Sequence, residues 1–317
     1  MCATRCPRCF VARRRARLRR VRIVLEAVPN VSEARDAGVV AAIGEAFEHG
    51  ANLLDVHSDA DHHRSVFTLV GDENGLIEGL LSGIRVAVDR IDLRAHAGAH
   101  PRIGVADVVP LVPLDPGEMQ QAIDAARTLA QRVGDELGLP VFLYGEAAGG
   151  VRPVFFRRGG LEALARRVAE GELVPDAGPD EVDSRSGGVL VGARQALIAY
   201  NLDLATDDLE IATSVAVAVR GSSGGMRGVQ AIGLRLPQAG RTQVSMNVID
   251  VDAAPLHEVV KRVRAEAHAR GTDILAGELV GLVPERVVDA AAAAGVELPG
   301  VDESQVLERV LRSRLAE

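Results

Sequence analysis

Apolar positions along the first half of the chain alternate between short β-branched runs and longer segments with helical spacing. The short runs predict strands at residues 21–28 (VRIVLEAV), 51–56 (ANLLDV), 64–71 (RSVFTLVG), 104–114 (GVADVVPLVPL) and 140–144. Amphipathic spacing predicts helices at residues 33–49, 76–91 and 118–137. Asn30 and Ser32 offer capping oxygens before the first helix, and Gly50 ends it.

The second half repeats the same order of elements. Strands are expected at residues 197–202, 229–236 and 242–250 and within 273–283, and helices at 207–220 and 255–270. Each half therefore has the order β-α-β-β-α-β, which predicts an α/β (α+β) fold of two ferredoxin-like subdomains with a ligand cleft between them. The gap between Val56 and Arg64 is too short for the crossover helix of a parallel sheet.

Residues 151–191 join the two halves and contain a short predicted helix at 161–169 and a polar run at 175–188. The segment is either a linker or a loop that borders the cleft, and composition favours neither interpretation. We expect a disordered basic tail at residues 1–20, one subdomain at 21–195 and a second at 196–317.

Composition narrows the class of protein. A chain of 317 residues with 47% hydrophobic and 25% charged residues is typical of a globular protein with two domains. No apolar run approaches the roughly 20 residues that span a bilayer, so no membrane partner is expected. The net charge of -8 argues against a general nucleic-acid partner.

The first 22 residues differ from the rest, because they hold nine arginines, no acid and all three cysteines, Cys2, Cys6 and Cys9. The segment resembles a transit peptide or a nucleic-acid-binding arm, and three cysteines without a fourth ligand are a weak zinc motif. We prefer a disordered extension, with Val21 as an alternative start. The body lacks cysteine, which is compatible with a reducing cytoplasm, and we expect a cytoplasmic protein.

Five histidines, His57, His62, His63, His96 and His100, fall in two predicted loops. Histidine titrates near neutral pH and is the usual general acid or base. The two loops adjoin different strands of one predicted sheet, so we expect them to converge at one end of it.

The first loop also permits a metal site. His57, Asp59, Asp61 and His62 superficially resemble the loops of binuclear hydrolases, so a metal-dependent hydrolase is one alternative function. Asp stands where such loops have a second His, and we expect no metal.

Residues 96–104 (HAGAHPRIG) predict a tight loop that presents a histidine at the start of a strand. His100 precedes Pro101, which favours an extended backbone, and Arg102 adds a guanidinium suited to a carboxylate. Proton transfer on an anionic substrate is the chemistry that this pairing indicates.

Ten ordered motifs resemble the formiminotransferase domain of glutamate formimidoyltransferases and of formiminotransferase-cyclodeaminase, and the resemblance covers about residues 21–294. They are PNVSE (29–33), LLDV (53–56), RSVFTLVG (64–71), HPRIGVADVVPLVP (100–113), LPVFLYGEAA (139–148), PDAGP (175–179), GARQALIAYNLDL (192–204), VQAIGLRL (229–236), QVSMNVIDVDAAPLH (243–257) and ELVGLVPERVVDAAA (278–292).

The resemblance implies reversible transfer of a formimidoyl group from N5 of tetrahydrofolate to L-glutamate, as in histidine degradation and one-carbon metabolism. It implies tetrahydrofolate as a substrate, L-glutamate as the acceptor and a homodimer. The catalytic histidine of the family falls on His100, and we assign supporting roles to His57, Arg64, His96 and Arg102. The folate-binding segment falls on Asp176, Ala177, Gly178, Pro179, Asp180, Glu181, Val182, Asp183, Ser184 and Arg185.

The sequence departs from the family pattern at several of these positions. His57 stands where the family has an acid, DHHR (61–64) replaces a loop like STNR, and Ala97 and Ala99 replace polar residues. The folate segment has Ala177, Val182 and Ser186 where aromatics are common, and adds Asp180, Glu181 and Asp183. The alternative is a non-catalytic or altered-specificity folate- or ligand-binding paralogue, and formyl and formimidoyl donors are both compatible.

Overall fold

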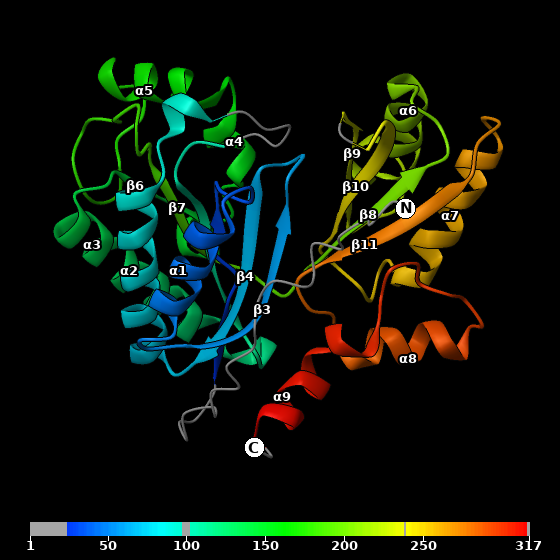
Figure 1. Ribbon diagram of the computed structural model, residues 1–317, viewed down its shortest axis with the longest axis horizontal. Coiled ribbons are helices and arrows are strands. Elements are labelled where there is room, and N and C mark those ends of the chain that lie inside the picture. Colours follow the sequence, from blue (N-terminus) through cyan, green and yellow to red (C-terminus); the bar gives the residue numbers. More distant parts are fainter. Residues whose placement is uncertain (1–23, 97–101, 238, 316–317) are drawn as a thin grey trace, which may run out of the picture.

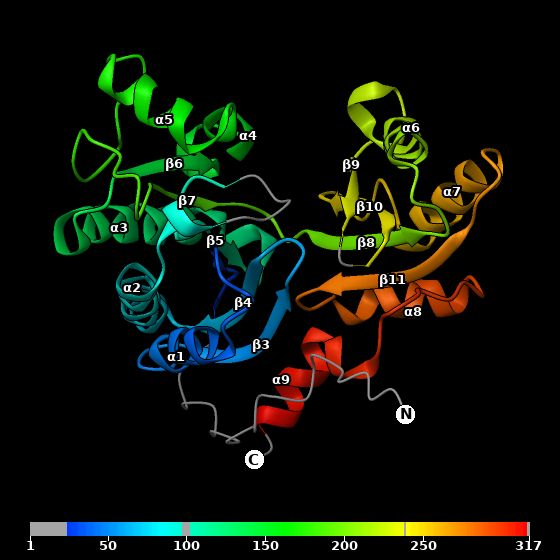
Figure 2. The same ribbon diagram turned by 45° about the horizontal axis from the view of Figure 1, so that its top comes forward.

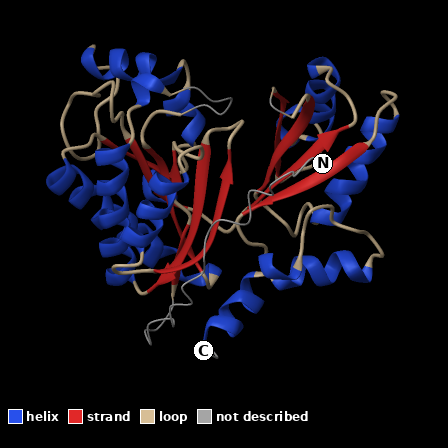
Figure 3. Ribbon diagram, viewed as in Figure 1, coloured by secondary structure: helices blue, strands red, loops and turns tan. Residues whose placement is uncertain are grey.

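The computed structural model describes residues 24–96, 102–237 and 239–315 and contains two sheets. Figure 3 shows the strands of both units turned toward the middle of the molecule and most of the helices on the outside. The basic tail predicted at residues 1–20 lies outside the described residues.

The larger sheet is built by the first half of the chain (Figure 1). Its strands are β1 (Leu25–Ala27), β2 (Asn30–Val31), β3 (Asn52–Asp59), β4 (Arg64–Gly71), β5 (Ala106–Pro113), β6 (Val141–Gly145) and β7 (Val189–Ala193). Strand β4 pairs antiparallel with β3 on one side and with β1 and β2 on the other, and β5 pairs with β1 and β2. Strands β7 and β6 then add parallel to β5, so the predicted β-α-β-β-α-β core is confirmed and extended by two strands.

Three helices, α1 (Ala37–Phe47), α2 (Glu73–Arg90) and α3 (Met119–Leu137), cover one face of this sheet. The first of them begins later than the predicted residue 33, because Asp36 is its N-cap and accepts hydrogen bonds from the amides of Gly38 and Val39. The predicted capping residue Asn30 instead lies in β2.

Of the two interpretations left open for residues 151–191, the structure does not support a plain linker, and the short helix predicted at 161–169 is present. This segment forms α4 (Pro153–Arg157) and α5 (Gly160–Ala169) and leads into β7, which lies between β5 and β6. Strand β7 is buried at all five positions, so it lacks the polar–apolar alternation that marks a half-exposed strand. Helices α4 and α5 cover the second face of the sheet at β6 and β7.

The smaller sheet contains β8 (Ile198–Leu204), β9 (Val229–Leu236), β10 (Arg241–Val248) and β11 (Ile274–Val280). Its order is β11-β8-β10-β9, and every pairing is antiparallel, as expected for a ferredoxin-like unit. Helices α6 (Leu209–Val219) and α7 (Leu256–His268) pack on one face, where Tyr200 and Leu202 are fully buried. Because side chains alternate along a strand, Asn201 and Asp203 face the opposite way.

Two further helices, α8 (Glu285–Ala293) and α9 (Leu307–Leu315), follow the second sheet, and α9 returns to the first unit (Figure 2). Its Leu307, Val310 and Leu311 pack with Leu282 against Leu54 of β3 and Val70 of β4. Glu285, at the start of α8, binds the guanidinium groups of Arg309 and Arg312. Leu282 and α9, which follow the last strand of the second sheet, therefore connect the two units.

No helix within the described ranges combines the length and the apolar character needed to cross a membrane.

Candidate functional site

The two histidine loops meet at one end of the larger sheet. The imidazole rings of His63 and His96 stack with their centroids 3.9 Å apart and their planes 20° from parallel. His96 Nε2 lies 3.1 Å from the carbonyl oxygen of His63, and Arg102 Nη2 donates to the carbonyl of His62 at 3.1 Å. The end of the β3–β4 hairpin and the residues just before β5 are therefore in contact, in line with the predicted convergence.

The environment of His96 favours its neutral form. Arg102 Nη1 lies 2.5 Å from His96 Nδ1, so a positive charge adjoins the ring. Burial, followed by the charges of Arg102 and His63, lowers the pKa of His96 to about 4. An imidazole with this pKa is a poor proton donor at neutral pH.

The PNVSE motif holds the hairpin end in place through Glu33. Its carboxylate accepts hydrogen bonds from the amides of Ala34, Arg35 and Asp36 and from His63 Nε2 at 3.0 Å. Burial alone would raise the pKa of Glu33, but these hydrogen bonds outweigh it and lower the pKa. His63 has a φ of 49°, in the left-handed region that side chains rarely adopt, so this anchor stabilises a strained turn.

Two guanidinium groups, those of Arg64 and Arg157, contact β2 and β5 of the larger sheet. Arg64 Nη2 donates to Asn30 Oδ1 on β2, and Arg157 Nη2 donates to Asp107 Oδ2 on β5. Asp107 is only 2% exposed, and its other oxygen accepts the amide of Ile103 at 2.7 Å. Burial, followed by the charge of Arg157, lowers the pKa of Arg64 to about 10, so it remains a cation at neutral pH.

A hydrogen-bonded chain joins the two sheets. His57 Nε2 lies 3.0 Å from Glu278 Oε1 on β11, and Asn201 Nδ2 on β8 donates to Glu278 Oε2 at 3.0 Å. Burial alone would raise the pKa of Glu278, but the hydrogen bond and charge of His57 and the amide of Asn201 lower it. His57 lies inside β3, not in the loop after a strand as predicted, because β3 continues to Asp59.

On the smaller sheet, Asp203 adds a further polar side chain beside the hydrogen-bonded chain of His57, Glu278 and Asn201. Its carboxylate accepts from Gln243 Nε2 at 2.9 Å and lies 3.1 Å from Arg241 Nε. Burial raises the pKa of Asp203, and although Gln243 and Arg241 oppose that rise, the charges of Glu278 and Asp59 add to it. Carboxylates from β3, β8 and β11 therefore influence one another between the sheets.

The residues of the alternative metal site are engaged in separate pairs. Asp59 accepts a hydrogen bond from the His62 amide at 2.7 Å and lies 3.0 Å from His62 Nδ1, whereas His57 contacts Glu278. Across the described part of the chain, no group of three or more His, Cys, Asp and Glu residues is arranged to hold a metal ion.

The predicted folate segment starts far from these residues. Asp176 accepts the amide of Leu143, and Ala177 bridges to Val141, both on β6. Strand β6 is at the opposite edge of the sheet from β3. At its other end, the Arg185 carbonyl accepts the amide of Leu93, and the next residue, Ser186, accepts the amide of Val105. Only the last residues of the segment therefore approach the histidine loops.

His100, Ala97 and Ala99 lie outside the described residues, so the position of the predicted catalytic imidazole is not given. Sequence reasoning missed Glu278, Asn201, Arg157 and the anchoring role of Glu33. Glu278 was detectable as a lone acid in an apolar strand pattern, whereas nothing in the sequence marked Arg157.

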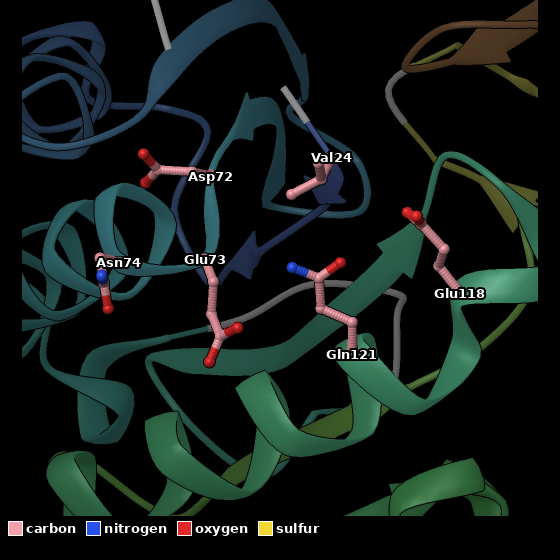
Figure 4. Close-up of a pocket in the computed structure, with 6 residues that line it drawn as sticks. All are labelled: Val24, Asp72, Glu73, Asn74, Glu118 and Gln121. Carbon is pink, nitrogen blue, oxygen red and sulfur yellow. The ribbon is translucent and has the colours of Figure 1, made fainter. Parts of the chain in front are cut away.

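A hollow of about 280 Å³ lies elsewhere, at the start of α2 and α3 (Figure 4). It is lined by Val24, Asp72, Glu73, Asn74, Glu118 and Gln121. Asp72 is the N-cap of α2, and none of the predicted site residues lines this hollow.

Comparisons with known proteins agree over nearly the whole chain. Residues 24–194 match the model of the formiminotransferase domain, N-terminal subdomain, and residues 199–305 match that of the formiminotransferase domain. A glutamate formimidoyltransferase of Thermoplasma acidophilum is 38% identical over 90% of this chain and 96% of its own length. One from Streptococcus pyogenes is 34% identical over 91% and 98%. The formimidoyltransferase-cyclodeaminase of Gallus gallus is 39% identical over 84% of this chain and 52% of its own length.

Proposed function

Because this chain belongs to the formiminotransferase family, we propose that it transfers a formimidoyl group reversibly between 5-formimidoyltetrahydrofolate and L-glutamate. The proposal rests on similarity along 96% and 98% of the length of two relatives named glutamate formimidoyltransferase. The α/β fold of two β-α-β-β-α-β units is the one that the resemblance implies.

The reaction needs one group that can both accept and donate a proton, and we assign this role to His100 of the HPR motif. Glutamate's amine attacks the formimidoyl carbon and loses a proton to the imidazole. The bond from that carbon to N5 of the folate then breaks, and the imidazole returns the proton to N5. Such catalysis contributes about 10²–10⁴-fold to a rate. The lowered pKa of His96 supports assigning the proton transfer to a different histidine.

Tetrahydrofolate is the proposed donor substrate, and we place it between the two facing sheets. The polar face formed by Asn201, Asp203 and Glu278 supports this placement, since hydrogen-bonding groups there suit a pterin. Arg64 and Arg102 remain the proposed carboxylate contacts. The folate role of residues 176–185 remains a prediction, best supported near Arg185.

A transfer assay with 5-formimidoyltetrahydrofolate and L-glutamate tests the proposal. In the variant His100→Ala, kcat should fall by about 10²–10⁴-fold while tetrahydrofolate affinity stays within about threefold. His268→Ala is the matched control, because His268 lies at the end of α7 with a 57% exposed side chain. Its kcat should equal that of the wild type.

Three results would contradict parts of this proposal. Unchanged turnover in His100→Ala would remove the assigned role of His100. Folate binding without transfer would favour the non-catalytic paralogue. Stoichiometric metal whose removal abolishes activity would favour the hydrolase.

The resemblance also leads us to propose a homodimer located in the cytoplasm. Light scattering of the purified protein tests the first point, since a particle of 33.4 kDa would be a monomer.

A further inference from the structure

Three guanidinium groups lie near one another where β2, β4, β5 and α4 meet. Arg64, Arg102 and Arg157 lie close enough for their charges to influence one another, and Asp107 is the carboxylate among them. Both Asp107 oxygens are already occupied, one by the Ile103 amide and one by Arg157. Asp107 is therefore hydrogen-bonded to Arg157 and not to Arg64.

Two guanidinium groups in this cluster have an unused donor. The Nε atoms of Arg64 and Arg157 are both buried and have no hydrogen-bond partner among the described residues. A buried donor without a partner destabilises the unliganded protein, and a ligand that accepts from it removes that cost. A guanidinium binds a carboxylate best through two parallel N–H groups, so these two side chains suit an incoming carboxylate.

Both guanidinium groups are also held in place before a ligand arrives. Arg64 donates to Asn30 Oδ1, and Asn30 is itself fixed by donating to the Val28 carbonyl at 2.8 Å. Arg157 is fixed by Asp107, and its side chain is 17% exposed, so it is not sealed from solvent. Binding to groups that are already ordered loses little side-chain entropy.

Charges of the opposite sign lie beside this cluster. Asp59 interacts electrostatically with Arg64 on one side and with Glu278 and Asp203 on the other. A molecule that bears both a carboxylate and an ammonium group, such as an amino acid, matches this arrangement of charges.

We propose that Arg64 and Arg157 form a carboxylate-binding subsite for a substrate of this enzyme and that Arg157 determines specificity. The inference rests on the proposed function and deepens it. Two substrates of the proposed reaction bear a suitable carboxylate, namely L-glutamate and the glutamyl tail of the folate. Arg157 reaches the subsite from α4, a helix that the sequence did not predict.

The substitution Arg157→Lys tests the subsite, because it keeps the charge and the pairing with Asp107 but removes the planar fork. Loss of a charge-assisted hydrogen bond should raise KM by roughly tenfold or more, with kcat within about threefold. Arg64→Lys should act in the same direction. Arg167→Lys is the matched control, since Arg167 packs on Phe155 of the same α4–α5 unit and donates to its carbonyl. It should leave both KM values unchanged.

Two outcomes support the subsite and identify its ligand. A higher KM for L-glutamate, with a weaker preference over L-glutamine, assigns it to the acceptor. Alternatively, the variant shows a higher KM than the wild type for the folate donor but the same KM for a tetrahydropteroate donor that lacks the glutamyl tail. This result assigns the subsite to the glutamyl tail. The inference is overturned if both KM values stay within about twofold of wild type.

The subsite can still be tested if the variant does not fold or if the wild type shows no transfer activity. Should Arg157→Lys fail to fold, Arg64→Lys gives the same comparison. Should the wild type transfer nothing, the proposed function fails, and calorimetry with L-glutamate and tetrahydrofolate still compares wild type with Arg157→Lys. Equal binding by the two proteins would then overturn the subsite.

Discussion

Two histidines near the same sheet end have opposite surroundings, and this difference limits what each can do. His96 is buried against the cation Arg102, which lowers its pKa to about 4. His57 instead faces the carboxylate of Glu278 from the other sheet. Its hydrogen bond and charge help to lower the pKa of Glu278, so His57 stabilises a carboxylate whereas His96 adjoins a cation.

The pair formed by His57 and Glu278 leads to a prediction about stability and pH. The folded-state pKa of Glu278 is lowered, so the carboxylate stabilises the fold above its ordinary pKa and loses that effect as the pH falls through the folded value. Glu278→Gln should lower the free energy of unfolding by about 1 kcal/mol at pH 7. The deficit should stay constant down to about pH 4.5 and narrow only as the pH falls below that value.

Urea unfolding of both proteins at pH 7 and pH 4 measures this effect. The double variant with His57→Gln provides the control, since the two changes should not add if the side chains interact. Additive changes, or a deficit independent of pH, would show that the pair contributes nothing.

Most elements followed from local sequence patterns. The repeated order of strands and helices was predictable from apolar, β-branched runs such as β4 and from helical spacing in α2 and α3. Strand β7 was missed because its apolar run is short and ends in Gly192 and Ala193. The contacts of Glu278 and Arg157 were not predictable, since they depend on how units distant in sequence pack.

The packing of α1 on α2 depends on small residues, which gives a prediction for Gly79 of α2. A Cβ atom at Gly79 would lie 2.4 Å from the Phe47 carbonyl oxygen and 2.9 Å from the Ala51 amide nitrogen. Gly79→Ala should therefore destabilise the protein, although alanine has a helix propensity about 1 kcal/mol better than glycine.

Thermal unfolding would measure this as a lower midpoint for Gly79→Ala. Ser214→Ala, on the exposed side of α6, serves as the control and should change the midpoint little. A midpoint at or above that of the wild type would mean that the two helices can separate at no cost.

At the scale of the whole molecule, the units are joined by the hydrogen-bonded chain through Glu278 and by the return of α9. Helix α9 itself follows the matched family segment, which ends at residue 305. The second contact has an apolar part on Leu54 and Val70 and a charged part between Glu285 and two arginines of α9.

Leu311→Ala should weaken the apolar part of this contact. Because Leu311 is only partly buried, we expect a loss of about 1–2 kcal/mol, below the roughly 2–5 kcal/mol of a fully buried leucine. Urea unfolding measures the loss. Ser313→Ala, at an exposed position of the same helix, is the control and should change the free energy of unfolding by less than about 0.5 kcal/mol. Equal losses in the two variants would contradict the packing role of Leu311.

The position of α9 also bears on how the protein is made. Leu54 and Val70 are synthesised early, yet most of the side chains that pack on them belong to α9, more than 200 residues later. During translation, Leu54 and Val70 therefore form an uncovered apolar patch on the first unit until residue 311 has left the ribosome. A stall before that point would expose the nascent chain to chaperones at this patch.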